Sequence, residues 1–388
     1  MEIGALFGRN LRMARYAVTA IFFLNGFVLA TWFVRIPAAQ EKLGLSAGTL
    51  SIALLGTAIG ALASMSVAGW LATRLGSRPV VVVCAVLLCL ALAPLALAPS
   101  LTFLVAAMVF TGASNGTLDV SMNSQAVAVE AGYGRPIMSS FHAAFSLGGL
   151  AGAASGGLVA ARGIGIEPHL LGVCVVGLVA ALVVTRALLP ADADRGGEAE
   201  PAFVRPTRAL AGLGVISFCV LLGEGAMSDW SAVYLNDTLG TGPGFAAAGY
   251  AAFSLAMAGG RLSGDALLSR FGATNVVRFC GALAAVGLGI SLLAAQPFLS
   301  IVGFACAGAG FSVVFPAALS AAGRSQEMPT GPAIAAVSTT GYFGFLVGPP
   351  VIGFIAEGIG LGGGLFVVVG LSAGIALLAG AVGAGGKA

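Results

Sequence analysis

Three polar side chains recur one helical turn apart within a long apolar stretch: Asn115, Asp119 and Asn123. In a helix they would share one face. An ionised side chain at the centre of a bilayer costs at least about 2.5 kcal/mol on insertion scales, so a retained acid indicates a function. The pattern predicts a polar stripe in which Asp119 takes up and releases a proton, with a structural hydrogen-bonding role as the alternative.

Two further titratable residues lie in other apolar stretches. His142 follows Asp119 across one short loop, which predicts a similar depth in the membrane and a proton shared between the two. Glu224 stands between Gly223 and Gly225, a pattern that favours a local break in the helix and a proton-coupling role for the acid. The alternatives are a polar lining role for His142 and a structural ion pair between Glu224 and Arg261.

A binding pocket for a polar solute needs a few polar and aromatic groups in an apolar surrounding. Asn25 and Tyr342 are central within their stretches and supply such groups. The predicted substrate-binding set is therefore Asn25, Asn115, Asp119, Asn123, His142, Glu224 and Tyr342.

The composition decides the solvent in which these residues work. Hydrophobic residues make up 58% of the 388-residue chain, charged residues only 9%, and the mean hydropathy is +1.02. A soluble globular domain, a disordered chain and a disulfide-rich scaffold are excluded, and a multi-pass membrane protein remains. A net charge of +3 gives no reason to expect a nucleic-acid partner.

Enzymatic and metal-binding patterns are weak. A serine-hydrolase pattern occurs at Gly112-Ala113-Ser114-Asn115-Gly116, but it lies inside an apolar stretch instead of at a strand-to-helix turn. The six cysteines lie in apolar stretches without metal-binding spacing. We therefore expect a protein that is not an enzyme, with no metal site and no cofactor, and with protons as the coupling ion.

About twenty apolar residues cross the hydrocarbon core, and such spans must be helical. Twelve stretches fit: 14–36, 47–72, 79–98, 101–129, 136–161, 168–190, 209–236, 244–270, 274–294, 298–322, 331–357 and 361–384. The predicted fold is all-α, with both termini in the cytoplasm because most Lys and Arg residues then lie on the inner side. We expect a multi-pass protein of the plasma (inner) membrane.

A charged stretch at 191–208 divides the chain into two predicted six-helix bundles, 1–190 and 209–388. The two halves share a repeat, because Leu71-x-x-Arg74-x-Gly76 recurs as Leu267-x-x-Arg270-x-Gly272. With six spans each, both halves have the same topology and are related by an axis along the membrane normal.

This organisation resembles the major facilitator superfamily. The family's loop after its second span, Gly-x-Leu-Ala-Asp-Arg-x-Gly-Arg, is similar to Gly69-Trp70-Leu71-Ala72-Thr73-Arg74-Leu75-Gly76-Ser77-Arg78, with Thr73 in place of the acid. The second half reads Gly260 to Gly272, where Asp265 stands at a different position. The resemblance implies transport by alternating access. Its expected gating and structural residues are Gly69, Arg74, Gly76, Arg78, Arg261, Asp265, Arg270, Gly344, Gly348 and Pro349.

Three segments resemble the fucose-permease-like branch of sugar:proton symporters: Phe22-Phe23-Leu24, Leu118 to Asn123, and Phe141 to Gly148. Phe33 stands where that branch has an acid. The resemblance implies proton-coupled transport of a small polar, sugar-like solute. Because one chain contains a complete site, we expect a monomer. The alternatives are a proton-coupled exporter of lipophilic compounds or metabolites, and a membrane sensor without transport.

Overall fold

The computed structural model describes all residues except 1, 135–136, 194–206, 208–209, 326–329 and 385–388. In the first half the helices are α1 (Glu2–Phe33), α2 (Ile36–Leu43), α3 (Ala47–Leu75), α4 (Ser77–Leu97), α5 (Leu101–Tyr133), α6 (Met138–Ala161) and α7 (Ile166–Val184). Two short 3₁₀ turns follow, η1 (Thr185–Ala187) and η2 (Ala191–Ala193).

The second half begins with α8 (Ala211–Val233), which ends in a π-turn, η3 (Tyr234–Thr238). It continues with α9 (Pro243–Phe271), α10 (Ala273–Ala294), α11 (Pro297–Phe311), α12 (Val314–Gly323), α13 (Thr330–Leu378) and α14 (Gly380–Ala384). The regular secondary structure of the described residues is therefore entirely helical, as the apolar composition predicts for a chain that crosses lipid.

Ten segments among the described residues are long and apolar enough to cross a membrane. One of them, Pro332–Gly383, is interrupted at Ile359 and Gly360, whose backbone angles are not helical, so it holds two helical pieces. Helix α9 has 29 residues but is not among the ten. The multi-pass membrane fold is thus established, while the count of twelve spans and the cytoplasmic termini stay predictions.

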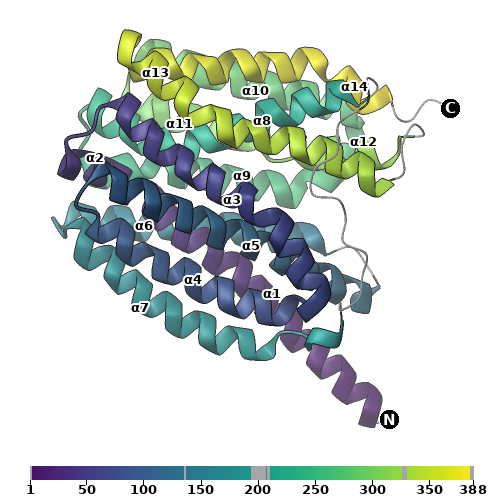
Figure 1. The fold of residues 1–388 in the computed structure, drawn as a ribbon. Coiled ribbons are helices and arrows are strands. Elements are labelled where there is room, and N and C mark those ends of the chain that lie inside the picture. The colour runs from purple at the N-terminus through teal and green to yellow at the C-terminus, as the bar shows by residue number, and fades with distance from the viewer. Residues whose placement is uncertain (1, 135–136, 194–206, 208–209, 326–329, 385–388) are drawn as a thin grey trace.

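The helices form two neighbouring groups (Figure 1). In the first, α1 packs on α6, α3 on α5, and α4 on both α5 and α7. In the second, α8 packs on α13, α9 on α11, and α10 on α11 and α13. The two groups meet along α6 with α9 and along α3 with α13. Most of the predicted 191–208 linker lies outside the described residues, so its boundaries remain a prediction.

The same close helix crossing occurs once within each group. A Cβ on Gly112 of α5 would overlap the Thr57 carbonyl of α3, and a Cβ on Gly308 of α11 would overlap the Phe253 carbonyl of α9. Glycine at these positions lets two backbones touch, which is how helices associate in lipid. The equivalent contacts support the internal repeat that the sequence predicts.

The shared Arg-x-Gly motif also has one backbone geometry. Gly76 ends α3 with φ 76° and ψ 156°, and Gly272 ends α9 with φ 78° and ψ 145°. Both angles lie in a region that L side chains avoid, and the next helix starts at once. The glycine in each half is therefore required by the same sharp turn between two spans.

Candidate functional site

Two of the three residues in the predicted polar stripe on α5 are joined by hydrogen bonds. The Asn123 Nδ2 atom donates to the Asp119 backbone oxygen at 2.8 Å and to the Asp119 Oδ1 atom at 3.2 Å. Both side chains are partly exposed although α5 is surrounded by other helices. The one-turn spacing thus places an amide donor on the acid, which fixes the orientation of the carboxylate.

Asp119 also faces the second group of helices. It lies close enough to Tyr342 of α13 for the carboxylate and the phenol to interact electrostatically. Tyr342 itself stacks near Phe345, with ring centroids 6.4 Å apart. The acid is therefore near a tyrosine of the second group as well as the amide on its own helix.

Two amide oxygens near this stripe lack a donor. The Asn25 side chain on α1 is 2% exposed and its Nδ2 atom contacts the Met122 sulfur at 3.6 Å. Within the part of the chain that the structure describes, neither Asn25 Oδ1 nor Asn115 Oδ1 has a hydrogen-bond partner. Buried acceptors are normally paired, so these two are suited to accept bonds from a hydroxyl-bearing solute.

His142 has a different environment from Asp119. Its ring packs edge-on against Phe22, with centroids 5.3 Å apart at 79°. Among the described residues, no hydrogen bond or ion pair joins His142 to Asp119, and the charged group that acts on the imidazole is Arg261. The structure does not bring the two predicted proton carriers into direct contact.

Arg261 joins three helices at the boundary. Its Nη1 atom donates to Ser146 Oγ at 2.9 Å and to the His142 backbone oxygen at 3.5 Å, both on α6. Its Nη2 atom lies 3.7 Å from Glu224 Oε2 on α8. The Glu224–Arg261 ion pair, one of the two roles open for Glu224, is therefore present.

The predicted break around Glu224 is wrong, because α8 runs without interruption from Ala211 to Val233. Gly223 and Gly225 have another role. A Cβ on Gly223 would press on the Phe311 ring, and one on Gly225 would press on the Phe345 ring. The two glycines admit aromatic side chains against α8 and leave Glu224 on a regular helix.

Tyr250 and Ser146 belong to this site but are absent from the predicted set. Tyr250 on α9 forms hydrogen bonds with the side chains of Ser228 and Ser254. It also interacts electrostatically with Glu224 and Arg261. Its ring also meets Phe33 of α1 at a centroid distance of 5.2 Å. Ser146 lies one turn from His142, so the helical period alone was a signal for it.

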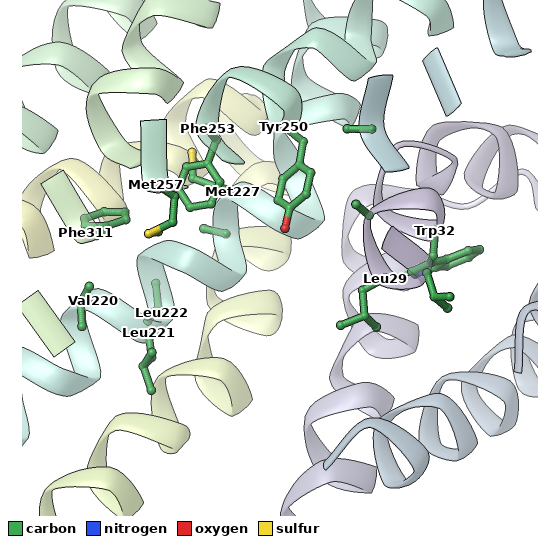
Figure 2. Close-up of a cluster of buried hydrophobic side chains, with 14 of the residues drawn as sticks. Leu29, Trp32, Val220, Leu221, Leu222, Met227, Tyr250, Phe253, Met257 and Phe311 are labelled. Atoms are coloured by element: carbon green, nitrogen blue, oxygen red, sulfur yellow. The ribbon is translucent and has the colours of Figure 1, made fainter. Parts of the chain in front are cut away.

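An apolar cluster adjoins these polar groups. Figure 2 shows Tyr250 between Leu29 and Trp32 of α1 and a group that includes Met227 of α8 and Phe253 of α9. All five residues are buried. The polar groups are thus set in an apolar surrounding, as a ligand site requires.

The predicted gating and structural residues of the first half lie near the end of α3 and the start of α4. The Arg74 guanidinium lies over the Trp70 ring at 4.7 Å, and Arg78 Nη2 donates to the Arg186 backbone oxygen at 3.0 Å. A Cβ on Gly76 would overlap the Ala191 backbone, whereas Gly69 has open space around it. Close packing therefore explains Gly76 but not Gly69.

In the second half, Asp265 and Arg270 point to different neighbours. Asp265 Oδ2 accepts from Ser139 Oγ of α6 at 3.4 Å, while the Arg270 guanidinium lies 5.3 Å from the Phe271 ring centroid. Asp265 thus contributes to the contact between α6 and α9.

Gly344, Gly348 and Pro349 lie on α13. A Cβ on Gly344 would approach the Phe218 backbone oxygen to 2.5 Å, and one on Gly348 would lie 3.3 Å from the Leu222 side chain. Both glycines therefore bring α13 onto α8, within the second group, and not onto the first group.

The contact of α13 with the first group lies further along, at the end of the bundle that carries α2 (Figure 1). Glu357 Oε1 accepts from the Gly48 backbone N–H at 2.7 Å, beside the Ser46 cap of α3. A Cβ on Gly353 would meet Ser51. A carboxylate at a helix N-terminus is electrostatically favourable, so Glu357 stabilises the contact between the two groups at this end.

Two groups of spanning helices that meet along partly exposed polar side chains are the architecture of a membrane transporter. The sequence model of the Major Facilitator Superfamily matches residues 18–330. The chain belongs to that superfamily.

The names of three related proteins say little about what they transport. The chain is 36% identical to an uncharacterized MFS-type transporter of Yersinia pestis, covering 87% of each chain. It is 35% identical to the uncharacterized transporter y4wD of Sinorhizobium fredii, over 93% of this chain and 96% of that one. It is 34% identical to the membrane protein MosC of Rhizobium meliloti, over 91% of this chain and 86% of that one.

Solved structures share the fold. A variant of the nucleoside transporter NupG has a TM-score of 0.73 at 14% identity, with 96% of this chain and 100% of that one covered. A bacterial homolog of the human lysosomal transporter Spinster has a TM-score of 0.72 at 14% identity, with 95% of both chains covered. At this identity the likeness concerns the fold.

Proposed function

We propose that this transporter moves a small polar, sugar-like solute across the plasma membrane by alternating access, driven by protons. The observation that carries the proposal is the position of Asp119, between the Asn123 amide on its own helix and Tyr342 of the opposite group. The resemblance of three segments to sugar:proton symporters supports it. One chain holds the whole site, and we expect a monomer that needs no cofactor besides protons.

Solute recognition would use the unpaired oxygens of Asn25 and Asn115 as acceptors for hydroxyl groups. Tyr342 and the rings around Phe22 supply apolar faces, which suit the carbon face of a sugar ring. Glu224, held by Arg261, is the candidate for a second, charge-balancing role. Loss of the hydrogen bond between Glu357 and the Gly48 backbone N–H would open the end of the bundle that carries α2.

The test is uptake of labelled monosaccharides and ribonucleosides by cells that express the protein, with and without a protonophore. We expect accumulation of at least one solute above its external concentration, and collapse of that accumulation when the protonophore is added. Cells with the empty vector provide the control. Uptake that equilibrates but never concentrates any solute would reject proton coupling.

The second candidate is proton-coupled export of lipophilic compounds or metabolites. It is favoured by Phe33, which packs on Tyr250 at the position where the symporter branch has an acid, and by the apolar cluster beside the site. An exporter would lower the accumulation of a lipophilic dye, and a protonophore would restore it. Unchanged dye levels across a broad panel would count against export.

A further inference from the structure

A groove opens on the side of the second group, between α9, α10 and the α11–α12 break. Its volume is about 590 Å³. The walls are almost entirely carbon, with a few small polar side chains among them. The residues that shape it include Ser263, Leu267, Phe271, Phe279, Ser312 and Val313.

The groove faces the membrane rather than the boundary between the groups. Leu267, Phe271 and Phe279 line it and are exposed. Arg261 and Asp265, in contrast, turn towards α6, where they contact Ser146 and Ser139. An exposed apolar surface on a spanning helix is in contact with lipid chains, so the groove is open to an acyl chain from the bilayer.

The length of the groove matches one lipid leaflet. It extends along α9 from Gly260 to Phe271, at the turn into α10. At a rise of 1.5 Å per residue this is about 16 Å, close to half of the roughly 30 Å hydrocarbon core. At the deep end, Gly260 lets α9 lie directly against the α11–α12 break, because a Cβ there would overlap Ser312.

Two exposed arginines are direct sequence neighbours of aromatic residues in the groove walls. The Arg270 guanidinium lies 5.3 Å from the ring centroid of Phe271, which is part of the wall. Arg278 is exposed and precedes Phe279 of the opposite wall. Arginine at the edge of the hydrocarbon core binds phosphate oxygens with a planar pair of donors, and it favours lipids with a net negative headgroup.

We propose that this groove binds an anionic phospholipid, with one acyl chain between α9, α10 and the α11–α12 break and the headgroup phosphate at Arg270 and Arg278. The proposal does not depend on the solute or on proton coupling. Its two parts are separable, because the walls select for a chain and the arginines select for the headgroup.

The experiment is native mass spectrometry of the full chain in detergent, titrated with dioleoylphosphatidylglycerol or dioleoylphosphatidylcholine. We expect tighter binding of the anionic lipid to the unaltered protein. The double variant Arg270→Gln, Arg278→Gln should bind it about thirty-fold more weakly, since each basic residue near a membrane surface contributes roughly five-fold. Arg324→Gln is the matched control, because Arg324 is exposed but bonded to Ser320 on α12, and it should change nothing.

Filling the groove tests the chain-binding part. Ser263→Phe should lower the binding of both lipids while both arginines remain, and Arg270→Lys with Arg278→Lys should retain most of the preference for the anionic lipid. Equal binding of the two lipids to the unaltered protein would overturn the proposal. So would an unchanged preference in the double glutamine variant, or lipid binding that Ser263→Phe leaves intact.

Discussion

The ion pair between Arg261 and Glu224 provides the sharpest energetic test of the site. Their atoms are 3.7 Å apart, and the two side chains are 17% and 18% exposed. A second pair, Lys42–Glu167, is shorter at 2.6 Å but more exposed, at 31% and 49%. If burial governs the strength, the longer pair is the stronger one.

The magnitude follows from the geometry. Two unit charges at this separation attract by about 4 kcal/mol at an effective dielectric constant of 20 and by about 1 kcal/mol in water. Because the Arg261–Glu224 pair is mostly but not fully buried, we expect a coupling energy of about 2 kcal/mol. Exposed pairs such as Lys42–Glu167 couple by only about 0.5 kcal/mol.

A double-mutant cycle measures both pairs. The variants Arg261→Gln, Glu224→Gln and their combination are compared by the free energy of unfolding in mixed detergent–SDS micelles, as are Lys42→Gln, Glu167→Gln and their combination. Arg261→Gln alone should be the most destabilising, since it leaves the Glu224 carboxylate without its cation. Additivity of the Arg261 and Glu224 variants within about 0.5 kcal/mol would show that the two side chains are not coupled and would contradict this expectation.

Two further predictions concern packing and closure. Gly148→Ala should destabilise the protein by about 1–3 kcal/mol because its Cβ would overlap the Phe23 backbone of α1, whereas Gly172→Ala, with open space around it on α7, should be neutral or stabilising in the same thermal-melting assay. Glu357→Gln should weaken the contact with the α3 N-terminus, so spin labels placed at the α3 N-terminus and near the interruption of α13 at Ile359 and Gly360 should show a larger share of long distances. Equal melting temperatures of the Gly148→Ala and Gly172→Ala variants would contradict the first expectation. A distance distribution in Glu357→Gln that matches the unaltered protein would contradict the second.

The fold was largely predictable because lipid leaves the chain few choices. Apolar stretches of spanning length must be helical, and the Arg-x-Gly repeat correctly placed equivalent turns at Gly76 and Gly272. The interruption of α13 at Ile359 and Gly360 was also anticipated, since the predicted stretches 331–357 and 361–384 meet there. The pattern of Gly223 and Gly225 misled because glycine in a membrane helix serves close packing as often as it breaks the helix.

The site was predictable only within single helices. The helical period placed Asn123 on Asp119, because that contact joins residues of one turn. It could not tell that Asp119 faces Tyr342, that Arg261 contacts Ser146, or that Glu357 caps α3, because each of these contacts joins helices far apart in the sequence. Nor could equal depth place His142 beside Asp119, since depth leaves the direction of a side chain around the helix undetermined.

The role of Asp119 as the carrier of the coupled proton is tested most directly by comparing two transport modes in proteoliposomes. With a solute identified by the uptake panel, accumulation driven by an imposed pH gradient is measured beside exchange between equal pools of solute, for the unaltered protein, for Asp119→Asn and for the control Asp237→Asn. We expect that Asp119→Asn retains exchange and loses accumulation, while Asp237→Asn, whose exposed carboxylate bonds Asn236 away from the stripe, retains both. Accumulation by Asp119→Asn at the level of the unaltered protein would contradict this role.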